Sequence, residues 1–238
     1  MGNSTQPLIS CRNLAVGYDG TPVLSDLSFT VTAGETVALV GRSGCGKTTL
    51  LKTVAGIIEP LAGEARVLDS TYPDRPPNGT LGYIPQRLGL VTHGTVFQNV
   101  LHGTLPDLGR MRSVLGRFPP DTEARARTAI EEVGLAEMEH RRVNALSGGQ
   151  QRRVAIARAF VQRPRVILAD EMLSELDDHT ADSIVTCLET LQDRTGMAII
   201  IVEHDRSMAE AISDRLLKLA DGHIQEIIDT TESAKVPP

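Results

Sequence analysis

The chain has 238 residues and a mass of 25.6 kDa, enough for one large α/β domain with or without a smaller subdomain. Lys and Arg number 24 against 30 Asp and Glu, so the formal net charge is −6. This acidic balance argues against a general nucleic-acid binder, which carries a basic surplus. Aromatic residues make up only 3% and tryptophan is absent, which also argues against a base-stacking platform.

No segment of the sequence predicts a membrane span or a secretory signal. The longest uninterrupted apolar run is Met197–Val202, whereas a span needs about 20 apolar residues. The N-terminal stretch Met1–Pro7 is polar and lacks an apolar signal core. Cys11, Cys45 and Cys187 are too few and too scattered for a disulfide or zinc framework. We therefore expect a cytoplasmic chain.

Short apolar runs alternate with helical patterns, which predicts an α/β fold with a largely parallel sheet. Antiparallel strands are expected near the N-terminus, at Leu8–Val16, Val23–Thr32 and Gly63–Leu68. Core strands are expected at Thr36–Val40, Thr80–Ile84, Val166–Ala169 and Met197–Val202. The last two are continuously apolar, as is typical of strands buried on both faces. Asp221-Gly222 predicts a hairpin that joins Leu216–Leu219 to His223–Ile228.

The middle of the chain predicts helices and loops without strands. A helix is expected at about Val96–Leu105. Asp121, which follows Pro119-Pro120, is expected to cap a second helix that runs to Val133. This region therefore reads as a helical insertion in the α/β core.

A glycine-rich loop with the full phosphate-binding pattern follows the strand Thr36–Val40; it reads Gly41-Arg42-Ser43-Gly44-Cys45-Gly46-Lys47-Thr48. Glycines let backbone N–H groups surround phosphate oxygens, and the helix that leaves the loop adds its positive N-terminal end. We expect Lys47 to reach the β- and γ-phosphates and the Thr48 hydroxyl to bind Mg²⁺.

Two carboxylates end the apolar run Val166–Ala169. A P-loop enzyme needs a second Mg²⁺ ligand at such a strand end, and Asp170 fits that role. Glu171, one residue later, points differently and is a candidate general base for a water molecule.

A second glycine motif, Leu146-Ser147-Gly148-Gly149-Gln150, precedes a helix expected at Gln151–Phe160. Ser147, the glycines and the free helix N–H groups form a second potential anion site. One mononucleotide does not obviously need two such sites about 100 residues apart. The alternative is an N-cap with a flexible lead-in.

Together these motifs resemble those of the ATP-binding subunits of ABC transporters, in the family's order and from about Leu8 to Ile228. Gly41–Thr48 resembles the Walker A loop, Leu146–Gln150 the ABC signature and Asp170-Glu171 the end of Walker B. By the same resemblance Tyr18 is the adenine-stacking aromatic, Gln86 the Q-loop glutamine and His204 the switch histidine. Ser174-Glu175-Leu176-Asp177 resembles the D-loop.

The resemblance implies ATP and Mg²⁺ as ligands and assigns the site residues. The catalytic set is Glu171, His204 and Gln86. The nucleotide-binding set is Tyr18, Gly41, Ser43, Gly44, Cys45, Gly46, Lys47, Thr48, Thr49, Ser147, Gly148, Gly149, Gln150 and Asp177. The Mg²⁺ ligands are Thr48, Gln86 and Asp170.

The resemblance also implies the fold: a single domain over 1–238, with a P-loop NTPase core, an N-terminal antiparallel β-subdomain and an inserted helical subdomain. The core is expected at about 1–88 and 157–229, and the helical subdomain at about 89–156. The tail Thr230–Pro238 is polar and ends in Pro-Pro, so we expect it to be disordered.

Partners follow from the resemblance as well. Two copies are expected to pair head-to-tail, with ATP between one Walker A loop and the other copy's signature, which accounts for the second anion site. Ser147 and Gly149 would contact the γ-phosphate bound by the partner. A membrane permease, and indirectly a solute-binding protein, complete the implied assembly at the cytoplasmic face of the membrane; no nucleic acid is expected.

Two positions depart from the family pattern. Met172 stands where the family usually has proline, and Glu175 stands where it usually has a small residue. Met172 leaves free a backbone φ that proline would fix. Neither change alters a catalytic atom, so we expect an effect on the tightness of dimer closure.

The chain carries one P-loop, no sustained heptad repeat and no membrane helices, which favours the separate ATP-binding subunit of an importer. Val96–Gly103, Arg112–Phe118 and Ala126–Leu135 resemble the phosphonate-importer subfamily, which suggests phosphonate, phosphite or phosphate as cargo. The alternatives are another ABC importer or exporter, and a stand-alone P-loop kinase or GTPase. A GTPase would carry Asn-Lys-x-Asp, which is absent, and a kinase would not need Leu146–Gln150.

Overall fold

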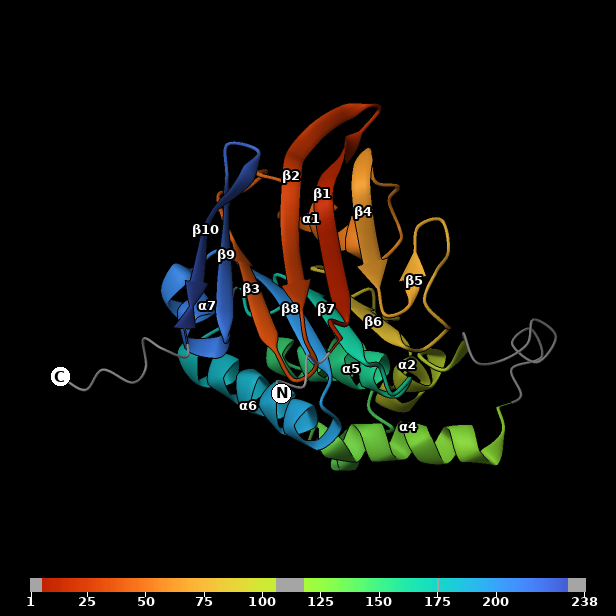
Figure 1. Cartoon of the computed structure of the whole chain (residues 1–238). Helices are drawn as coiled ribbons and strands as arrows, with labels where there is room; N and C mark the ends of the chain where they lie inside the picture. Colours follow the sequence, from red (N-terminus) through yellow and green to blue (C-terminus); the bar gives the residue numbers. More distant parts are fainter. Residues whose placement is uncertain (1–5, 106–117, 175, 231–238) are drawn as a thin grey trace, which may run out of the picture.

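The computed structural model describes residues 6–105, 118–174 and 176–230, which form two β-sheets and a layer of helices (Figure 1). The first sheet is antiparallel, in the order β2-β1-β4-β5. Its strands are β1 (Ile9–Tyr18), β2 (Thr21–Val31), β4 (Ala62–Val67) and β5 (Ser70–Thr71). The predicted N-terminal antiparallel strands are therefore confirmed.

The second sheet has six strands in the order β10-β9-β3-β8-β7-β6. They are β3 (Thr36–Val40), β6 (Leu81–Ile84), β7 (Val166–Asp170), β8 (Ala198–Glu203), β9 (Arg215–Ala220) and β10 (His223–Asp229). Strands β9, β3, β8, β7 and β6 run parallel to one another. The edge strand β10 pairs antiparallel with β9. The predicted parallel core and its terminal hairpin are confirmed.

The central strands are buried on both faces, and successive side chains enter two different cores. In β7, Val166 and Leu168 pack toward the antiparallel sheet and helix α1 (Lys47–Val54). Ile167 and Ala169 pack toward the helical layer. This alternation follows from the two-residue period of a strand. Helix α1 contacts β1 and β4 of one sheet and β7 of the other, so it lies between the two sheets.

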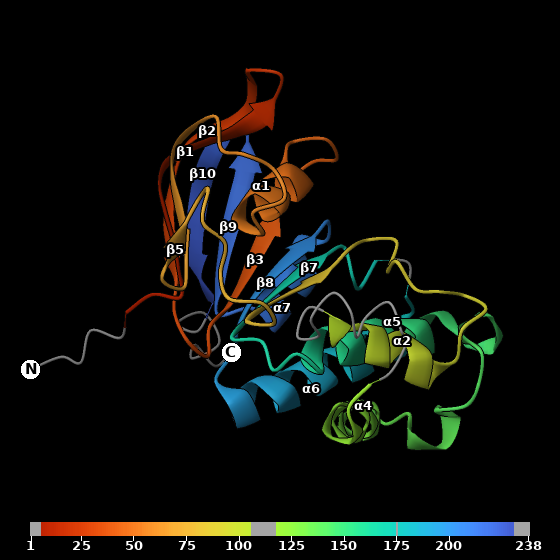
Figure 2. The ribbon, with the colours of Figure 1, turned by 90° about the vertical axis from the view of Figure 1, so that its right-hand side faces the viewer.

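The helical layer covers the opposite face of the parallel sheet (Figure 2). It contains α2 (Val96–His102), α4 (Pro120–Glu132), α5 (Gly148–Phe160) and α6 (Asp178–Thr195). The short helix α7 (Arg206–Ile212) follows β8, and two 3₁₀ turns, η2 (Ala136–Met138) and η3 (Val143–Ala145), precede α5. None of the helices within the described ranges is both long enough and apolar enough to cross a membrane.

Some predicted helix boundaries were wrong. Asp121 does not cap α4, because Pro119 occupies the cap position and Asp121 lies in the first turn, where its charge favours the helix dipole. Helix α2 ends at His102 and not at about Leu105. Helix α5 begins three residues early, at Gly148, because the Ser147 side chain already caps it. The tail 231–238 and residues 112–117 of the subfamily resemblance lie outside the described residues.

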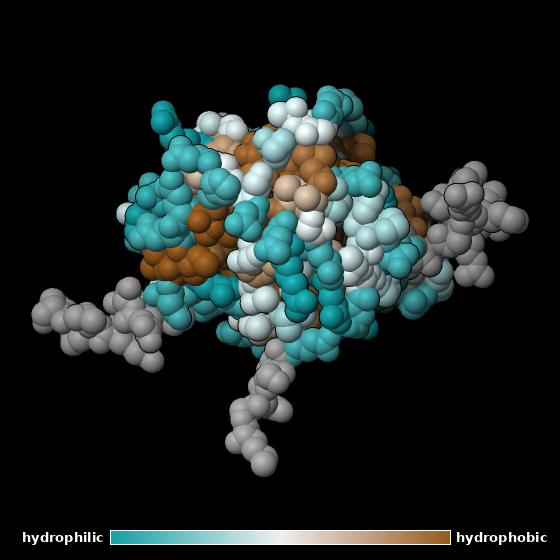
Figure 3. All heavy atoms as spheres, turned by 45° about the horizontal axis from the view of Figure 1, so that its top comes forward, coloured by the Kyte–Doolittle hydropathy of each residue, from teal (hydrophilic) through white to brown (hydrophobic). Residues whose placement is uncertain are grey.

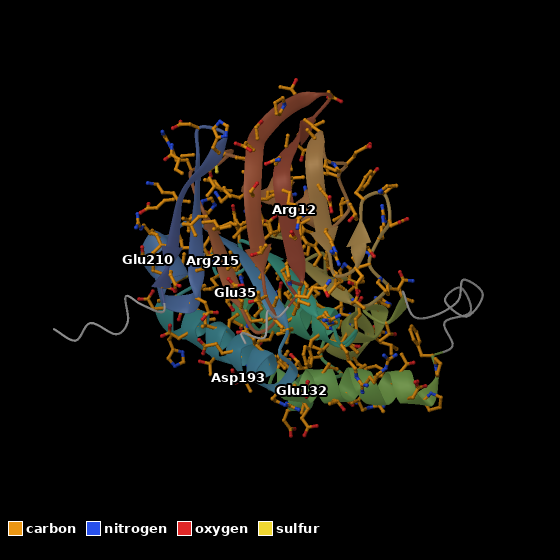
Figure 4. All side chains as sticks on the ribbon, in the orientation of Figure 1. Arg12, Glu35, Glu132, Asp193, Glu210 and Arg215 are labelled. Carbon is orange, nitrogen blue, oxygen red and sulfur yellow. The ribbon has the colours of Figure 1, made fainter. Side chains whose placement is uncertain are left out.

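An ion pair adds to the strand pairing that joins the hairpin to the rest of the molecule. Arg215, the first residue of β9, lies 2.8 Å from Glu35, which directly precedes β3 (Figure 4). The same guanidinium also donates to the carbonyl of Thr30 in β2. The start of the parallel sheet is thereby joined to the antiparallel sheet.

Candidate active site

The residues expected to do chemistry follow four adjacent parallel strands. Because the carboxyl ends of parallel strands share one edge of a sheet, the loops after β3, β6, β7 and β8 meet there. Gly41 follows β3, Gln86 lies two residues after β6, and His204 follows β8. Asp170 ends β7 and Glu171 comes next. The structure brings these predicted residues to one edge.

The glycine-rich loop needs its glycines for conformation and for close packing. Gly44 and Gly46 have φ values of 79° and 104°, a region that side chains disfavour. A Cβ on Gly46 would lie 2.9 Å from the side chains of Val23 and Leu24. The Cys45 sulfur packs inside the loop, where a Cβ on Gly41 would lie 2.8 Å from it.

The Lys47 side chain is buried and donates hydrogen bonds to neutral acceptors. Its side chain donates from Nζ to the carbonyls of Gly41 at 2.7 Å and Arg42 at 3.2 Å, and the residue is 4% exposed. Within the described residues no ion pair is recorded for Lys47. A buried ammonium is costly without an opposite charge, and Gly46 supplies no side-chain cap to the start of α1. The loop therefore fits a phosphate group.

Thr48 and Asp170 form a pair of oxygen ligands. The Thr48 hydroxyl donates to Asp170 Oδ1 at 3.0 Å, and Asp170 itself is 3% exposed. Burial raises the pKa of Asp170, the nearby Glu171 charge also raises it, and the Thr48 hydrogen bond opposes both. Hydroxyl and carboxylate oxygens suit Mg²⁺, so these two residues fit the predicted metal site.

Sequence reasoning missed one partner of this pair. The Tyr83 hydroxyl donates to Asp170 Oδ2 at 3.4 Å. Burial raises the pKa of Tyr83, and the adjacent Asp170 charge raises it further. This contact depends on the pairing of β6 with β7, which places Tyr83 opposite Leu168, two residues before Asp170. Knowledge of that pairing would have identified Tyr83 as a partner of Asp170.

Both carboxylate oxygens of Glu171 are engaged by other loops. Gln86 Nε2 donates to Oε2 at 2.5 Å, and His204 Nε2 lies 2.5 Å from Oε1. The backbone of Glu171 has φ +51°, a left-handed conformation that costs a non-glycine residue about 1–3 kcal/mol. The structure thus brings two of the predicted catalytic side chains, Gln86 and His204, into contact with the third, Glu171.

A second acid lies beside Glu171. Glu203, the last residue of β8, is 2% exposed and accepts a hydrogen bond from the Leu173 amide at 3.2 Å. Burial raises the pKa of Glu203 to about 7, and the charges of Glu171 and Asp205 raise it while the Leu173 bond and Arg152 oppose the rise. Pattern analysis did not assign Glu203, because an acid after an apolar strand also fits a solvated turn.

Tyr18 lies next to the start of α1. Its hydroxyl accepts from the Thr49 hydroxyl at 3.5 Å, and the residue is 50% exposed. An exposed ring at this end of β1 is accessible for stacking on a base.

The second glycine motif forms a separate cluster. Ser147 and Gln150 exchange hydrogen bonds of 3.3 and 3.0 Å that close a capping box at the start of α5. Asp177 caps α6 and accepts from the Thr180 amide at 2.9 Å. A Cβ on Gly149 would lie 2.4 Å from the Thr180 side chain, so the two helix starts touch.

Within the described part of the chain, no hydrogen bond or ion pair links residues 147–150 to the loop 41–49. The structure therefore brings the predicted residues together as two groups. One contains Lys47, Asp170, Glu171 and their partners; the other contains the starts of α5 and α6. Glu175 of the predicted D-loop lies outside the described residues.

Comparison with known proteins gives a family match. The family model described as ABC transporter matches residues 24–174. The chain is 38% identical over 226 residues to the spermidine/putrescine import ATP-binding protein PotA of Legionella pneumophila (strain Lens), covering 94% of this chain and 59% of that protein. The chain therefore spans only about six-tenths of the PotA length.

A second relative is matched over more of its length. The phosphonates import ATP-binding protein PhnC 2 of Haloarcula marismortui is 36% identical over 224 residues, covering 91% of this chain and 83% of that protein. Among solved structures, a dimeric ATP-binding cassette in a post-hydrolysis state bound to ADP and phosphate superposes with a TM-score of 0.77 at 27% identity. That match covers 93% of this chain and 98% of the other.

The burial of Glu203 predicts a pH-dependent stability. Since its pKa rises from 4.5 to about 7 on folding, the folded chain holds a proton that the unfolded chain releases between these values. The unfolding free energy should therefore fall as pH rises from 4.5 to 7, by roughly 3 kcal/mol from this group. Glu203→Gln should remove that part of the slope, as measured by urea denaturation of the nucleotide-free chain from pH 4.5 to 8.

Glu210→Gln is the matched control, because Glu210 lies on the surface of α7 and its side chain is 39% exposed. Its stability profile should run parallel to that of the wild type. A Glu203→Gln profile parallel to the wild type would show that burial does not shift Glu203.

Proposed function

Because the chain belongs to the ABC transporter family, we propose that it hydrolyses MgATP and thereby powers import through a separate membrane permease. One observation carries the proposal: the Glu171 carboxylate lies where the loops after β6, β7 and β8 meet, beside the Thr48–Asp170 pair. This arrangement supplies a base and metal ligands together at the edge where the phosphate loop begins.

Each side chain has a role that its position supports. Lys47 would bind the terminal phosphates as a point charge, and Thr48, Asp170 and Gln86 would hold Mg²⁺, which neutralises charge on the phosphates when bound. Glu171 would accept the proton of the attacking water. His204, 2.5 Å from Glu171, would orient that carboxylate and the water. Tyr18 would stack on the adenine.

We propose that two copies pair head-to-tail. The capped start of α5, with Ser147 and Gly149, has free helix N–H groups that suit an anion. It makes no recorded contact with the phosphate loop of its own chain among the described residues, so the anion it suits would be bound by a second copy. The likeness to a dimeric cassette supports this arrangement.

Replacing the proposed base should separate binding from turnover. Glu171→Gln keeps the shape of the side chain but cannot accept a proton, so the hydrolysis rate should fall by about 10²- to 10⁴-fold. The affinity for ATP should stay near the wild-type value. Phosphate release and equilibrium ATP binding measure the two quantities.

The surface variant Glu210→Gln serves as the control for a lost carboxylate and should hydrolyse ATP at the wild-type rate. Wild-type turnover in Glu171→Gln would remove Glu171 from the role of base.

A groove beside the Gln86 loop is the proposed docking site for the permease. It has a volume of about 400 Å³ and its walls come from β6, the following loop, the end of α2 and the end of α5. Lining residues include Tyr83, Gly89, Val91, His102 and Leu105. The residue Val91 is 51% exposed, so the groove offers an apolar contact.

Arg158 of α5 couples this groove to the active site. Its guanidinium donates to the carbonyls of Gly89, at 2.6 Å, and Leu88. Burial lowers the pKa of Arg158. Because Gln86 begins the same loop, release of Gln86 from Glu171 would move the groove wall.

We propose a phosphorus oxyanion, such as a phosphonate, phosphite or phosphate, as the imported substrate. The helical-region sequence supports this class, and this chain covers 83% of the phosphonate-import relative against 59% of the polyamine-import relative. The competing candidate is a polyamine, which the 38% identity to PotA favours. A permease-bound subunit of either kind would lie at the cytoplasmic face of the membrane.

Uptake in cells tests the substrate and the groove together. Deletion of the gene should abolish ATP-dependent uptake of methylphosphonate and leave putrescine uptake intact. Complementation with Val91→Glu should fail to restore uptake, because a charge in the groove opposes docking, while the purified variant keeps its ATPase activity.

Ile57→Glu is the matched control, since Ile57 is 56% exposed and lies outside the groove lining. It should restore uptake. Loss of putrescine uptake alone on deletion would contradict the substrate class, and full uptake with Val91→Glu would contradict the docking site. Figure 3 shows a mainly hydrophilic surface with scattered hydrophobic patches, so single exposed aliphatic residues are not unusual elsewhere.

A further inference from the structure

The three residues that directly follow Glu171 are held by the side chains of Arg152 and Glu203, which come from two other elements. Arg152 of α5 donates from Nε to the Met172 carbonyl at 2.5 Å and from a terminal nitrogen to the Ser174 carbonyl at 2.6 Å. Glu203, at the end of β8, accepts from the Leu173 amide between them at 3.2 Å. The Met172 and Leu173 residues are each 1% exposed. Every residue of this segment is therefore fixed through its backbone.

Arg152 reaches this segment from the start of the helix that carries the second glycine motif. It lies five residues after Ser147, and a Cβ on Gly148 would lie 3.5 Å from one of its terminal nitrogens. The planar guanidinium suits two acceptors at once, because its donors form a rigid fork. A hydrogen bond with a charged donor is also roughly twice as strong as a neutral one.

The segment needs such restraint for two reasons. Glu171 has φ +51°, a conformation that persists only where the surroundings over-determine it. Met172 follows it, and no ring fixes the φ of residue 172. The Glu171 amide donates to the Val202 carbonyl at 3.1 Å, and the Ser174 hydroxyl donates to the Glu171 carbonyl at 2.8 Å. The bonds from Arg152 to Met172 and Ser174 add to these and help to hold the Glu171 carboxylate toward Gln86 and His204.

We propose that Arg152 is a positioning residue for Glu171, which it holds in place through the carbonyls of Met172 and Ser174. The inference rests on the proposed role of Glu171 as the base. A displaced Glu171 carboxylate would slow proton transfer, so the effect of Arg152 should fall on the rate of the chemical step.

Arg152→Gln tests the proposal, with Arg153→Gln as the matched control. Arg153 is the next residue of α5 and also donates to two carbonyls, those of Val133 at 2.6 Å and Ser183 at 3.2 Å, away from Glu171. Arg152→Gln should lower kcat about tenfold or more, since a small misplacement of a reacting group has effects of this size. ATP affinity should change by less than about twofold. Arg153→Gln should lower the thermal midpoint and leave kcat within about twofold of the wild type.

Arg152→Lys is the rescue variant, because it keeps a cationic donor at this position. Its single ammonium reaches one carbonyl, so its kcat should lie between those of the wild type and Arg152→Gln, which a merely structural role of Arg152 would not predict.

Three results would overturn the proposal. They are an Arg152→Gln kcat within about twofold of the Arg153→Gln value, a parallel loss of ATP affinity, and a folded rescue variant as slow as Arg152→Gln. The assays use the purified full chain, and the wild type is measured first. A wild type without ATPase activity would defeat the proposed function, whereas an active wild type with a fully active Arg152→Gln would defeat this inference alone.

Discussion

Burial of the parallel strands on both faces is the constraint that places the chemistry. Strands β3, β7 and β8 carry apolar side chains into two cores, one under the helical layer and one against the antiparallel sheet. Polar and charged groups in such strands would be costly, so they are confined to the ends. Asp170 and Glu203 are the last residues of their strands. The phosphate loop, the base and the metal ligands lie at one edge because the strand interiors exclude them.

The same constraint explains why acidic groups are crowded at this edge and have raised pKa values. Asp170 and Glu203 are buried, and burial together with the charge of the nearby Glu171 raises the pKa values of both acids. The Thr48 hydroxyl, the Leu173 amide and the side chains of Gln86 and His204 offset part of this cost. A bound cation would relieve the rest. An acidic edge opposite the buried Lys47 thus suits a metal-bound phosphate.

The sequence was sufficient for the core strands and the phosphate loop, because both depend on local patterns. Thr36–Val40 was predicted with the bounds that the structure has, since five buried residues end at an unmistakable glycine loop. Asp121 was misplaced, because Pro and Asp compete for the start of a helix within three residues. The hydrogen bond from Tyr83 to Asp170 and the clamp from Arg152 depend on which strands and helices become neighbours. Sequence spacing alone does not contain that information. Helices α6 and α7 were left unassigned, although Asp177 and Asp205 cap them.

The separation of Ser147 from Lys47 would make the proposed hydrolysis depend on a second copy. One group of residues binds phosphate and metal, while the other presents a capped helix start with unused N–H groups. A site completed by a second copy would make closure of the pair a condition for hydrolysis. The restraint of residues 172–174 by Arg152 would then link the helix that meets the partner's nucleotide to the base of the same chain.

Mixing two inactive variants tests this shared site most directly. Lys47→Ala and Ser147→Arg each damage both sites of a homodimer, but a mixed dimer has both lesions in one composite site and leaves the other site intact. ATP hydrolysis should therefore reappear on mixing, together with nucleotide-driven dimerisation measured by sedimentation. Hydrolysis by a demonstrably monomeric wild-type chain, at a specific rate independent of protein concentration, would contradict the account.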